Sequence, residues 1–306
     1  MSAFDQLRGR GVHRIGSTLA VASLNGVTAH GIPIGPLQFD RLEAAPAARC
    51  TSRTQGNVSK NTEEVMMADQ SSTLMRREEV AEGTMAFHFE KPSGFSFRAG
   101  QFADVTLIDP PETDAKGNTR TFSIASPPFA DELVFTTRMR NTAFKRSLKK
   151  VPLTAEVKIG PAAGAFTLHK NLAKPAIFLA GGIGITPFLS IVQQADRDRL
   201  SQKLYLFYSN RRPEDAAFLD TLRALETTNP NFRLICTMTE MSKSKQEWKG
   251  ETALIDKEML CRHLANLQGP IYYIAGPPTM VTAMRETLVS AGIEENDIRT
   301  DEFVGY

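Results

Sequence analysis

The stretch AIFLAGGIGITP, residues 176–187, joins an apolar strand directly to a glycine-rich turn. Glycines at positions 181, 182 and 184 let the backbone take positive φ and approach a ligand closely. Pro187 suits the first position of a following helix, whose free N–H groups and positive end then face an anion. The pattern indicates a site for a dinucleotide phosphate, although glycines also end strands for structural reasons alone.

The composition is that of an ordinary soluble globular protein. With 306 residues, 42% of them hydrophobic and 23% charged, the chain is long enough for two domains. A net charge of +2 gives no excess of cations for a nucleic-acid surface, and no apolar run reaches the roughly 18 residues of a membrane span. We therefore expect no nucleic-acid partner and no membrane-spanning segment.

The cysteines and histidines do not indicate a metal. Cys50, Cys236 and Cys261 are too scattered for a disulfide framework, a zinc site or an iron–sulfur cluster. The five histidines show no metal-ligand spacing either. We expect no metal site, and because unpaired thiols fit a reducing compartment, we expect a cytoplasmic protein.

The first seventy residues differ from the rest of the chain. No lysine precedes Lys60, and the stretch is rich in Gly, Ala, Ser, Thr and Arg without a sustained helical or strand period. Arginines before Thr18–Leu24 give a weak likeness to a targeting signal, but this apolar run is short and interrupted. We expect residues 1–70 to be disordered, or to be an artefact that precedes a true start at Met66 or Met67.

From Thr73 to about His169 the pattern indicates short strands separated by glycine and proline. Met85, Phe87 and Phe89 alternate with three other residues, which is the period of a half-buried strand. Further elements are expected as strands at 101–108, 121–125, 133–139 and 155–159, a hairpin loop at 109–118 and a short helix at 142–149. This series predicts a small antiparallel barrel or sandwich, to which we assign residues 71–172.

After Pro175 the rhythm changes to strands alternating with helices, which predicts a parallel sheet in a domain spanning 173–306. The expected elements are strands at 176–180, 203–209, 232–238 and 271–275, and helices near 188–195, 214–225, 257–267 and 279–291. Ligands of such sheets bind beyond the carboxyl ends of the strands. The turn at 181–187 and the sequence AGPP at 275–278 both follow strands, so both point to one crevice.

Five short motifs, taken in order, resemble the ferredoxin–NADP reductase superfamily. They are RTFS at 120–123, Gly160-Pro161 with Phe166, the turn at 181–187, GPP at 276–278 with Met280, and DEF at 301–303. Each is weak alone, but their order across two domains of the right classes makes the resemblance specific from about residue 75 to the end. It implies an antiparallel barrel of the ferredoxin reductase type that holds FAD, followed by a domain that holds NAD(P)H.

The resemblance assigns residues 120–123 to the flavin, Thr121 included. Arg120 would offer a bidentate fork to a flavin phosphate, a geometry that suits a guanidinium. Phe122 would stack on the isoalloxazine, and Ser123, also a catalytic candidate, would place its hydroxyl near flavin N5, where hydride arrives. The family usually has Tyr in place of Phe122, so one hydrogen bond, to the ribityl chain, should be missing.

The start of the predicted helix at 142–149 is assigned to the FAD pyrophosphate in the same way. The N–H groups of Thr142, Ala143 and Phe144 would face the phosphates, and Lys145 would add charge. This start departs from the commoner Gly-x-x-Ser or Thr pattern of the family. The basic residues that follow are either a solvated face or an attraction for a small acidic redox protein.

On the nucleotide side, the resemblance assigns residues to a pyrophosphate turn and to a loop beside the nicotinamide. They are Gly182, Gly184, Thr186, Pro187, Gly276, Pro277 and Met280. Plant-type members carry a Cys immediately before the second loop, whereas this chain has Ala275, so no thiol is available there. A plain strand-to-helix turn would also explain that loop, because proline is favoured in the first turn of a helix.

Coenzyme choice would be set after the second strand of the nucleotide-binding domain. An NADP 2′-phosphate calls for cationic and hydroxyl partners, whereas a ribose diol calls for an acidic acceptor. Ser209, Arg211 and Arg212 favour NADPH, but Glu214 and Asp215 follow closely, so NADH stays open.

The C-terminal residues complete the site that the resemblance implies. In similar reductases an aromatic side chain covers the flavin, and a nearby carboxylate takes part in proton delivery. Asp301 fits the carboxylate, while Phe303 and Tyr306 both fit the aromatic residue, of which only one can cover the flavin. We favour Phe303, and the alternative is a final strand that merely buries this side chain.

These residues predict an FAD-dependent NAD(P)H oxidoreductase, which moves hydride from nicotinamide C4 to flavin N5. Electrons would then pass to an external acceptor, which is a ferredoxin, a flavodoxin, an oxygenase component or a small molecule. Two alternatives stay open. One is a flavin reductase that uses free flavin as a substrate, and the other is a non-catalytic flavin- or nucleotide-binding subunit of a larger electron-transfer complex.

Overall fold

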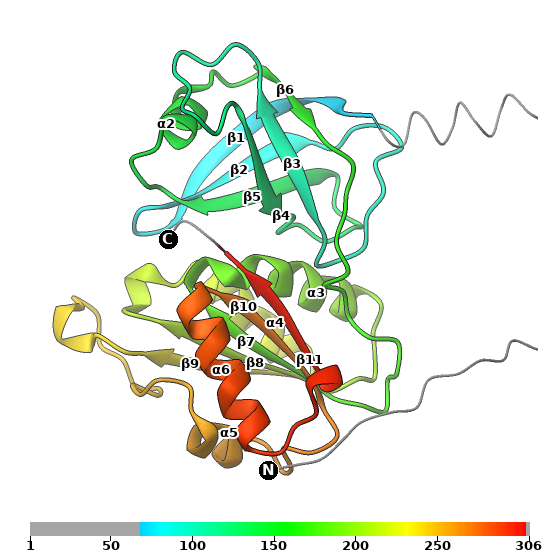
Figure 1. Cartoon of the computed structure of the whole chain (residues 1–306), viewed down its shortest axis with the longest axis vertical. Coiled ribbons are helices and arrows are strands. Elements are labelled where there is room, and N and C mark those ends of the chain that lie inside the picture. The colour runs from blue at the N-terminus through cyan, green and yellow to red at the C-terminus, as the bar shows by residue number, and fades with distance from the viewer. Residues whose placement is uncertain (1–67, 304–306) are drawn as a thin grey trace, which may run out of the picture. The chain divides into compact units, whose positions relative to one another are not determined.

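The computed structural model describes residues 68–303, which lie in one compact unit (Figure 1). The expectations for residues 1–67 and for Tyr306 fall outside the described residues. Within 68–303 an antiparallel sheet is followed by a parallel sheet with helices, which confirms the predicted fold class. The domain limits at 71–172 and 173–306 stay a prediction. No helix of the described residues is long and apolar enough to span a membrane.

The first sheet has six antiparallel strands in the order β4-β3-β6-β1-β2-β5. Their bounds are β1 (Gln70–Ala81), β2 (Thr84–Glu90), β3 (Phe102–Leu107), β4 (Thr119–Ser123), β5 (Glu132–Arg138) and β6 (Glu156–Ile159). The two outer strands meet through a bridge between Ile124 and Phe135, and the Ala125 N–H donates to Val134 O at 2.8 Å. The sheet therefore closes into a barrel rather than a sandwich.

The barrel is filled mainly by aromatic side chains. Phe87 and Phe89 of β2 are fully buried, as is Phe144 of the one helix in this part, α2 (Ala143–Lys150). Burying each such ring stabilises the fold by about 1.5–3 kcal/mol. The expected alternation along β2 fails at Ala86 and His88, which are also buried, and Glu132 and Glu78 of the neighbouring strands contact the two ring nitrogens of His88 at 2.7 and 3.0 Å.

The second sheet has five parallel strands in the order β11-β10-β7-β8-β9. Their bounds are β7 (Ala176–Gly181), β8 (Leu204–Asn210), β9 (Phe232–Met238), β10 (Ile271–Gly276) and β11 (Ile298–Glu302). The helices are α3 (Ile185–Arg197), α4 (Leu219–Thr228), α5 (Lys257–His263) and α6 (Pro278–Ser290), with 3-10 turns η1 (Gly182–Gly184), η2 (Pro213–Asp215), η3 (Met241–Lys243) and η4 (Glu295–Asp297).

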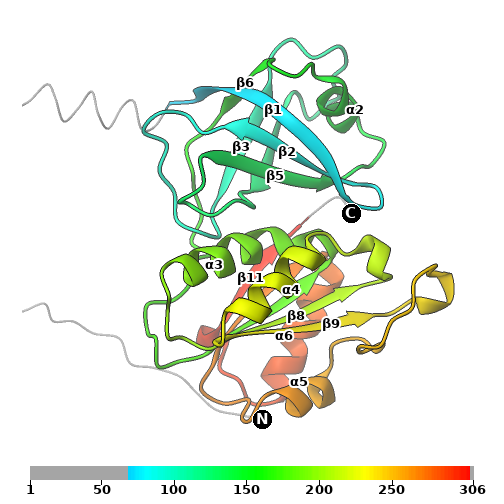
Figure 2. The same cartoon turned by 180° about the vertical axis from the view of Figure 1, so that it is seen from behind.

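Helices cover both faces of the parallel sheet. Phe188 and Leu222, from α3 and α4, share one buried cluster with Phe178 of β7. Met259 and Leu288, from α5 and α6, share another cluster with alternate residues of the same strands. The helix pairs therefore lie on opposite faces, as Figures 1 and 2 show from the two sides. Burial on both faces explains the nearly continuous apolar runs in these strands.

Two local expectations were wrong. The predicted helix at 214–225 begins only at Leu219, because Phe218 takes the left-handed conformation (φ +60°) and residues 213–215 form a separate 3-10 turn. Pro187 is the third residue of α3 rather than the first, since the helix starts at Ile185. Pro187 still lies in the first turn of α3, and Phe218 lies just before α4. The N–H groups at these positions have no partner within a helix, so neither helix needs them.

The end of β4 packs directly against α3. Ser190 Oγ of α3 donates to the carbonyl oxygen of Ser126 at 2.7 Å, and Ala125 belongs to the same buried cluster as α3. Gly100 has φ +94°, and an added Cβ would lie 2.9 Å from the Ile191 side chain. Only glycine fits there. These contacts fix the end of β4 beside the helix that follows the glycine-rich turn.

Candidate functional site

The barrel brings together the two stretches that were assigned separately to FAD. The rings of Phe122 on β4 and Phe144 at the start of α2 lie with their centroids 5.9 Å apart, and the Arg120 guanidinium lies 5.1 Å from the Phe144 centroid. Ser123 is buried, and the Thr121 hydroxyl donates to Asp104. A single region of the barrel therefore carries all of these predicted cofactor-binding residues.

Arg120 is held by the loop between β3 and β4. Its Nη1 donates to the carbonyl oxygens of Lys116, Gly117 and Thr119 at 2.7–2.9 Å, and its Nη2 contacts Asp114 Oδ1 at 2.8 Å. The pKa of Asp114 lies below its usual value because the Lys116 N–H and the Arg120 guanidinium stabilise the carboxylate. A phosphate that used both arms of Arg120 would have to compete with Asp114.

The start of α2 gathers positive charge. Thr142 caps the helix by accepting from the Lys145 N–H at 3.4 Å, and the first turn contains no acidic residue. Lys145 Nζ donates to Arg138 O at 2.8 Å. Burial, together with the charges of Arg140 and Arg120, lowers the pKa of Lys145 to about 8.

These cations fit a bound anion. Within residues 68–303, Arg140 makes no ion pair, and no carboxylate offsets the lowered pKa of Lys145. An anion placed against the α2 N-terminus would stabilise the charged form of Lys145 and meet the positive end of the helix. The donor set therefore suits the pyrophosphate of FAD, the group that the resemblance implies for this position.

The glycines of the turn are required for a reason other than the positive φ that was expected. Of its three glycines, only Gly182 has positive φ (+52°). A Cβ on Gly184 would overlap the Ala275 carbonyl oxygen, and a Cβ on Gly181 would overlap Met280 Sδ. These two glycines are required by close packing between the ends of β7 and β10, not by their φ angles.

This packing places the two nucleotide motifs in contact, as the sequence predicted. Pro277 Cδ would lie 3.0 Å from a Cβ on Gly181, and Gly276 packs against the same glycine backbone. The Thr186 hydroxyl donates to Ile183 O at 3.1 Å within its own turn, and Pro187 is buried. No side chain caps α3 and its first turn has no acidic residue, so its N-terminal N–H groups suit a phosphate.

The C-terminal strand adds a carboxyl group to the same end of the sheet. Asp301 pairs in register with Ala275, directly before the 276–280 loop, and burial raises the pKa of its carboxyl. The Phe303 N–H donates to Gly276 O at 3.0 Å, and the ring packs against the buried cluster of α3. Asp301 and Phe303 therefore lie with the nucleotide motifs.

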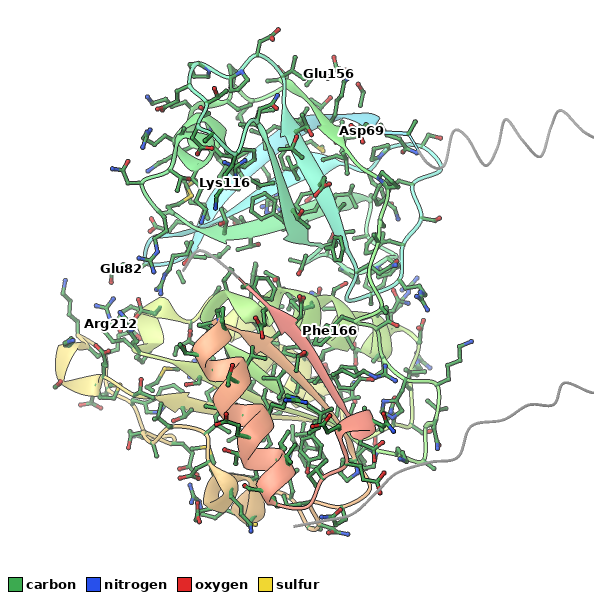
Figure 3. The ribbon with its side chains drawn as sticks, viewed as in Figure 1. Asp69, Glu82, Lys116, Glu156, Phe166 and Arg212 are labelled. Atoms are coloured by element: carbon green, nitrogen blue, oxygen red, sulfur yellow. The ribbon has the colours of Figure 1, made fainter. Side chains whose placement is uncertain are left out.

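Ser209, Arg211 and Arg212 lie at the end of β8, where Ser209 pairs with Gly181. The Arg211 side chain is 69% exposed, with its Nε 3.5 Å from Glu240. Arg212 instead binds Asp215 and Glu82; Figure 3 shows Glu82 and Arg212 close together. Arg211 is thus largely exposed with one long contact to a carboxylate, whereas Arg212 is held by two carboxylates.

A cavity of about 420 Å³ lies beside these arginines. Its lining residues are Gly83, Arg138, Met139, Arg140, Arg211, Arg212, Asp215, Glu240 and Lys243. Sequence reasoning missed Arg138, Arg140 and Lys243 as parts of this site. Lys243 follows β9 much as Arg211 follows β8, and the carboxyl ends of neighbouring parallel strands meet at one edge of the sheet, so this position could have been inferred.

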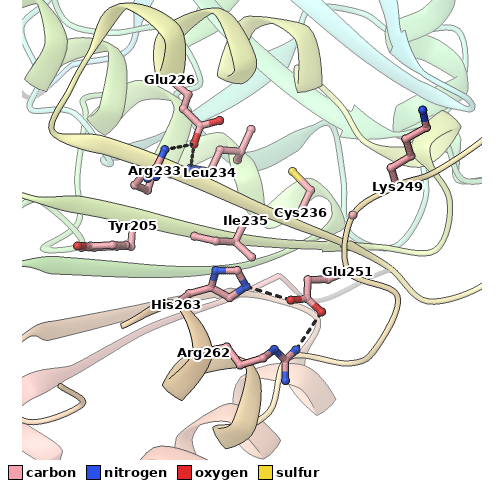
Figure 4. A pocket seen from close by; sticks show the side chains of 11 residues that line it. Tyr205, Glu226, Arg233, Leu234, Ile235, Cys236, Lys249, Glu251, Arg262 and His263 are labelled. Carbon is pink, nitrogen blue, oxygen red and sulfur yellow. Dashed lines mark hydrogen bonds and ion pairs between the residues drawn. The ribbon is translucent and has the colours of Figure 1, made fainter. Parts of the chain in front are cut away.

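A larger cavity of about 650 Å³ lies along β9, away from every predicted site residue (Figure 4). Its carboxylate Glu251 is already paired with Arg262 and His263, at 2.9 and 3.0 Å. Burial raises the pKa of Cys236 in the same wall to about 12, so this thiol stays protonated. No cluster of His, Cys, Asp and Glu within residues 68–303 is arranged to hold a metal ion. The larger of these two cavities therefore does not coincide with the predicted site residues.

The family model for the oxidoreductase NAD-binding domain matches residues 178–286. The matched range begins inside β7 and ends inside α6. It therefore contains the glycine-rich turn, the loop after β8 and the loop at 276–280.

Relatives of the chain include reductase components of oxygenases. The chain is 26% identical over 229 residues to the reductase component of propane 2-monooxygenase from Mycolicibacterium smegmatis, which covers 70% of this chain and 61% of that protein. It is 23% identical over 278 residues to reductase component 2 of terephthalate 1,2-dioxygenase from Comamonas sp., which covers 90% of this chain and 74% of that protein. The chain thus spans about six-tenths of the length of the first of these relatives.

The solved structure of a ferredoxin NADP+ reductase from Neisseria gonorrhoeae, with bound FAD and NADP, has the same fold. The TM-score is 0.64 at 21% identity, over 76% of this chain and 98% of that one. This likeness confirms the fold that the resemblance implied, and the match to the NAD-binding domain and the relatives agree with the resemblance. The chain thus has the two-domain fold of the ferredoxin–NADP reductases, and residues 178–286 match the oxidoreductase NAD-binding domain.

Proposed function

We propose that the chain is an FAD-dependent NAD(P)H oxidoreductase that passes electrons from NAD(P)H through flavin to an external acceptor. The observation that carries the proposal is the contact between the segment just after β4 and α3, where Ser126 O accepts from Ser190 Oγ at 2.7 Å. One side of this contact carries the stretch assigned to the flavin, and the other follows the uncapped turn that suits a dinucleotide phosphate. Hydride transfer requires the two cofactors to meet, and a contact between these two segments supports such a meeting.

In this proposal each group of residues has its own task. When bound, FAD supplies the chemistry of accepting a hydride and releasing electrons singly or in pairs. Lys145 and the N–H groups of Thr142, Ala143 and Phe144 hold its phosphates, together with Arg120.

Phe122 would offer a ring face to the isoalloxazine of bound flavin, and Ser123 would offer a hydroxyl near its N5. The turn residues Gly182, Gly184, Thr186 and Pro187 hold the coenzyme pyrophosphate through backbone N–H groups. The loop residues Gly276, Pro277 and Met280 border the nicotinamide. The task of proton delivery would fall to Asp301, whose raised pKa favours the protonated form, and Phe303 would cover the flavin.

The proposed acceptor is a separate redox protein, such as an oxygenase component. The named relatives are reductase components of a monooxygenase and a dioxygenase, which supports this choice. Lys149 and Lys150 at the end of α2 are exposed and add to the charge of Arg140, so the surface beside the proposed flavin site suits an acidic partner. A cytoplasmic location is part of the proposal, supported by the unpaired thiols of Cys236 and Cys261.

A flavin reductase that uses free flavin as a substrate is the second candidate. The structure favours it at two positions, because Arg120 is engaged by Asp114 and because Phe122 lacks the hydroxyl that Tyr would supply. Both features weaken the hold on flavin. Loss of all colour on desalting, with NAD(P)H oxidation restored by added flavin, would favour this candidate.

The test of the proposed function is an anaerobic visible spectrum of the desalted protein, before and after NADPH and, separately, NADH. We expect a flavin spectrum, present from the start or after reconstitution with FAD, that bleaches with at least one nucleotide. A protein that cannot be reconstituted with FAD would contradict the proposal, and the reading as a nucleotide-binding subunit would replace it. If flavin were bound but neither nucleotide reduced it, the remaining hypothesis would be a non-catalytic flavin-binding subunit.

A further inference from the structure

Arg212 is occupied by carboxylates from two different parts of the chain. Its Nε and Nη2 bind the two oxygens of Asp215, each at 2.9 Å, and Nη2 also lies 3.1 Å from Glu82 Oε2. The bidentate contact to Asp215 comes from the turn that follows Arg212. Glu82 comes from the hairpin between β1 and β2, in the barrel.

The hairpin is fixed to this loop by more than one ion pair. The Glu82 N–H donates to Glu214 O at 2.7 Å, and Arg138 of β5 shares Asp215 through its Nη2 at 2.9 Å. The Asp215 side chain is only 8% exposed, so the pair with Arg212 is shielded from solvent. Glu82 is therefore held beside the end of β8 by backbone and side-chain contacts.

The neighbouring cations of the 420 Å³ cavity are less completely paired. Arg211 and Lys243 are 69% and 70% exposed, and both share one carboxylate, Glu240, at 3.5 and 2.7 Å. Arg140 has no ion-pair partner within the described residues. An anion entering the cavity would meet these three cations, whereas the charge of Arg212 is already balanced by Asp215 and Glu82.

We propose that Glu82 is a specificity-determining residue for the coenzyme, because its carboxylate helps to offset Arg212, a cation that would otherwise favour the 2′-phosphate of NADPH over the ribose diol of NADH. The inference rests on the proposed function, since it takes this loop to hold the adenosine end of NAD(P)H. It places part of the coenzyme choice in the barrel, outside the nucleotide-binding sheet. The negative charge of Glu82 acts over several ångströms. Its effect falls on the 2′-phosphate, which is charged, and not on the adenine, which is neutral.

The experiment compares wild type with Glu82→Gln by calorimetric titration of adenosine 2′,5′-bisphosphate and, separately, of AMP. We expect the affinity for the bisphosphate, divided by that for AMP, to rise about three- to tenfold at low salt and to change less at high salt. The ratio of kcat/KM for NADPH to that for NADH should rise in parallel. Glu82 is 64% exposed, so the amide should not disturb folding.

Glu90→Gln is the matched control, because Glu90 is an exposed carboxylate at the far end of β2. It should leave both affinities unchanged. Arg211→Gln should lower the bisphosphate affinity and spare AMP, which checks that the phosphate reaches this cavity.

The outcomes separate the inference from the proposed function. Equal changes for the two ligands in Glu82→Gln, or no change, would overturn the role of Glu82 while the oxidoreductase stands. If wild type bound none of AMP, the bisphosphate, NADPH and NADH, the proposed function would be overturned, and the inference with it.

Discussion

The start of α2 and the end of β8 both gather basic residues beside an expected phosphate, yet their electrostatics are opposite. At α2, burial together with the cations Arg140 and Arg120 lowers the pKa of Lys145 to about 8. At β8, the carboxylates of Asp215 and Glu82 raise the pKa of Arg212. The number of basic residues is similar, and the difference lies in the carboxylates that the fold brings to them. A basic motif therefore identifies an anion site only when its charges are left unbalanced.

Removing Asp215 should have the largest effect, since it would leave Arg212 and Arg138 without their shared carboxylate. We expect Asp215→Asn to lower the free energy of unfolding by about 2–4 kcal/mol, because breaking a shielded ion pair strands the remaining charges. Urea denaturation followed by circular dichroism measures this change. Asp220→Asn is the control, because Asp220 is 97% exposed and its contact to Arg223 should contribute almost nothing. Equal stability of the two variants would refute the contrast between the regions.

The lowered pKa of Lys145 predicts a pH-dependent hold on FAD. Below pH 8 the ammonium is charged and can bind phosphate, whereas above pH 8 it is neutral in the free protein and must take up a proton on binding. The affinity for FAD should therefore fall by up to about tenfold between pH 7 and pH 9. The charged groups that face Lys145 are Arg120 and Arg140.

Lys145→Met should bind FAD about tenfold more weakly at pH 7 and should lose this pH dependence. Quenching of flavin fluorescence during titration with apoprotein measures both. Lys158→Met, on an exposed position of β6, should behave as wild type. If Lys145→Met kept the wild-type dependence of FAD affinity on pH, a group other than Lys145 would be responsible for it.

Releasing Arg120 from its loop should have the smallest effect. Asp114→Asn removes the carboxylate that occupies Nη2, so we expect the affinity for FAD to rise about three- to fivefold. The same fluorescence titration measures it, in parallel with Asp109→Asn in the same loop as a control. Weaker binding by Asp114→Asn would mean that Asp114 positions Arg120 for the phosphate rather than competing with it.

Much of the fold was predictable because its strands carry strong local patterns. The buried strand at 176–181 and the paired apolar positions Phe144 and Leu148 of α2 lie where the sequence placed them. Phe218 could not be foreseen as a break, since a positive φ at a bulky residue is decided by tertiary packing. The glycines were correctly linked to the turn, but for the wrong reason at Gly184, because the clash with Ala275 depends on a strand nearly a hundred residues away.

The candidate site divides in the same way. Residues on one strand or turn, such as Arg120 and Phe122, could be named from local motifs. The partners Glu82 and Asp114 could not, since only the folded chain brings their carboxylates to the arginines. Arg212 in particular is part of an ion-pair network that the sequence did not indicate, and its assignment to the coenzyme phosphate stays a prediction.

The most direct test of the oxidoreductase itself is hydride transfer within the FAD-reconstituted protein. Anaerobic stopped-flow bleaching of the flavin would be recorded with the preferred nucleotide, either unlabelled or carrying deuterium at one face of nicotinamide C4. The account predicts rapid bleaching that slows markedly when one of the two faces is labelled, because that hydrogen moves directly to the flavin. Absence of bleaching, or bleaching that neither label slows, would contradict direct transfer between adjoining cofactor sites.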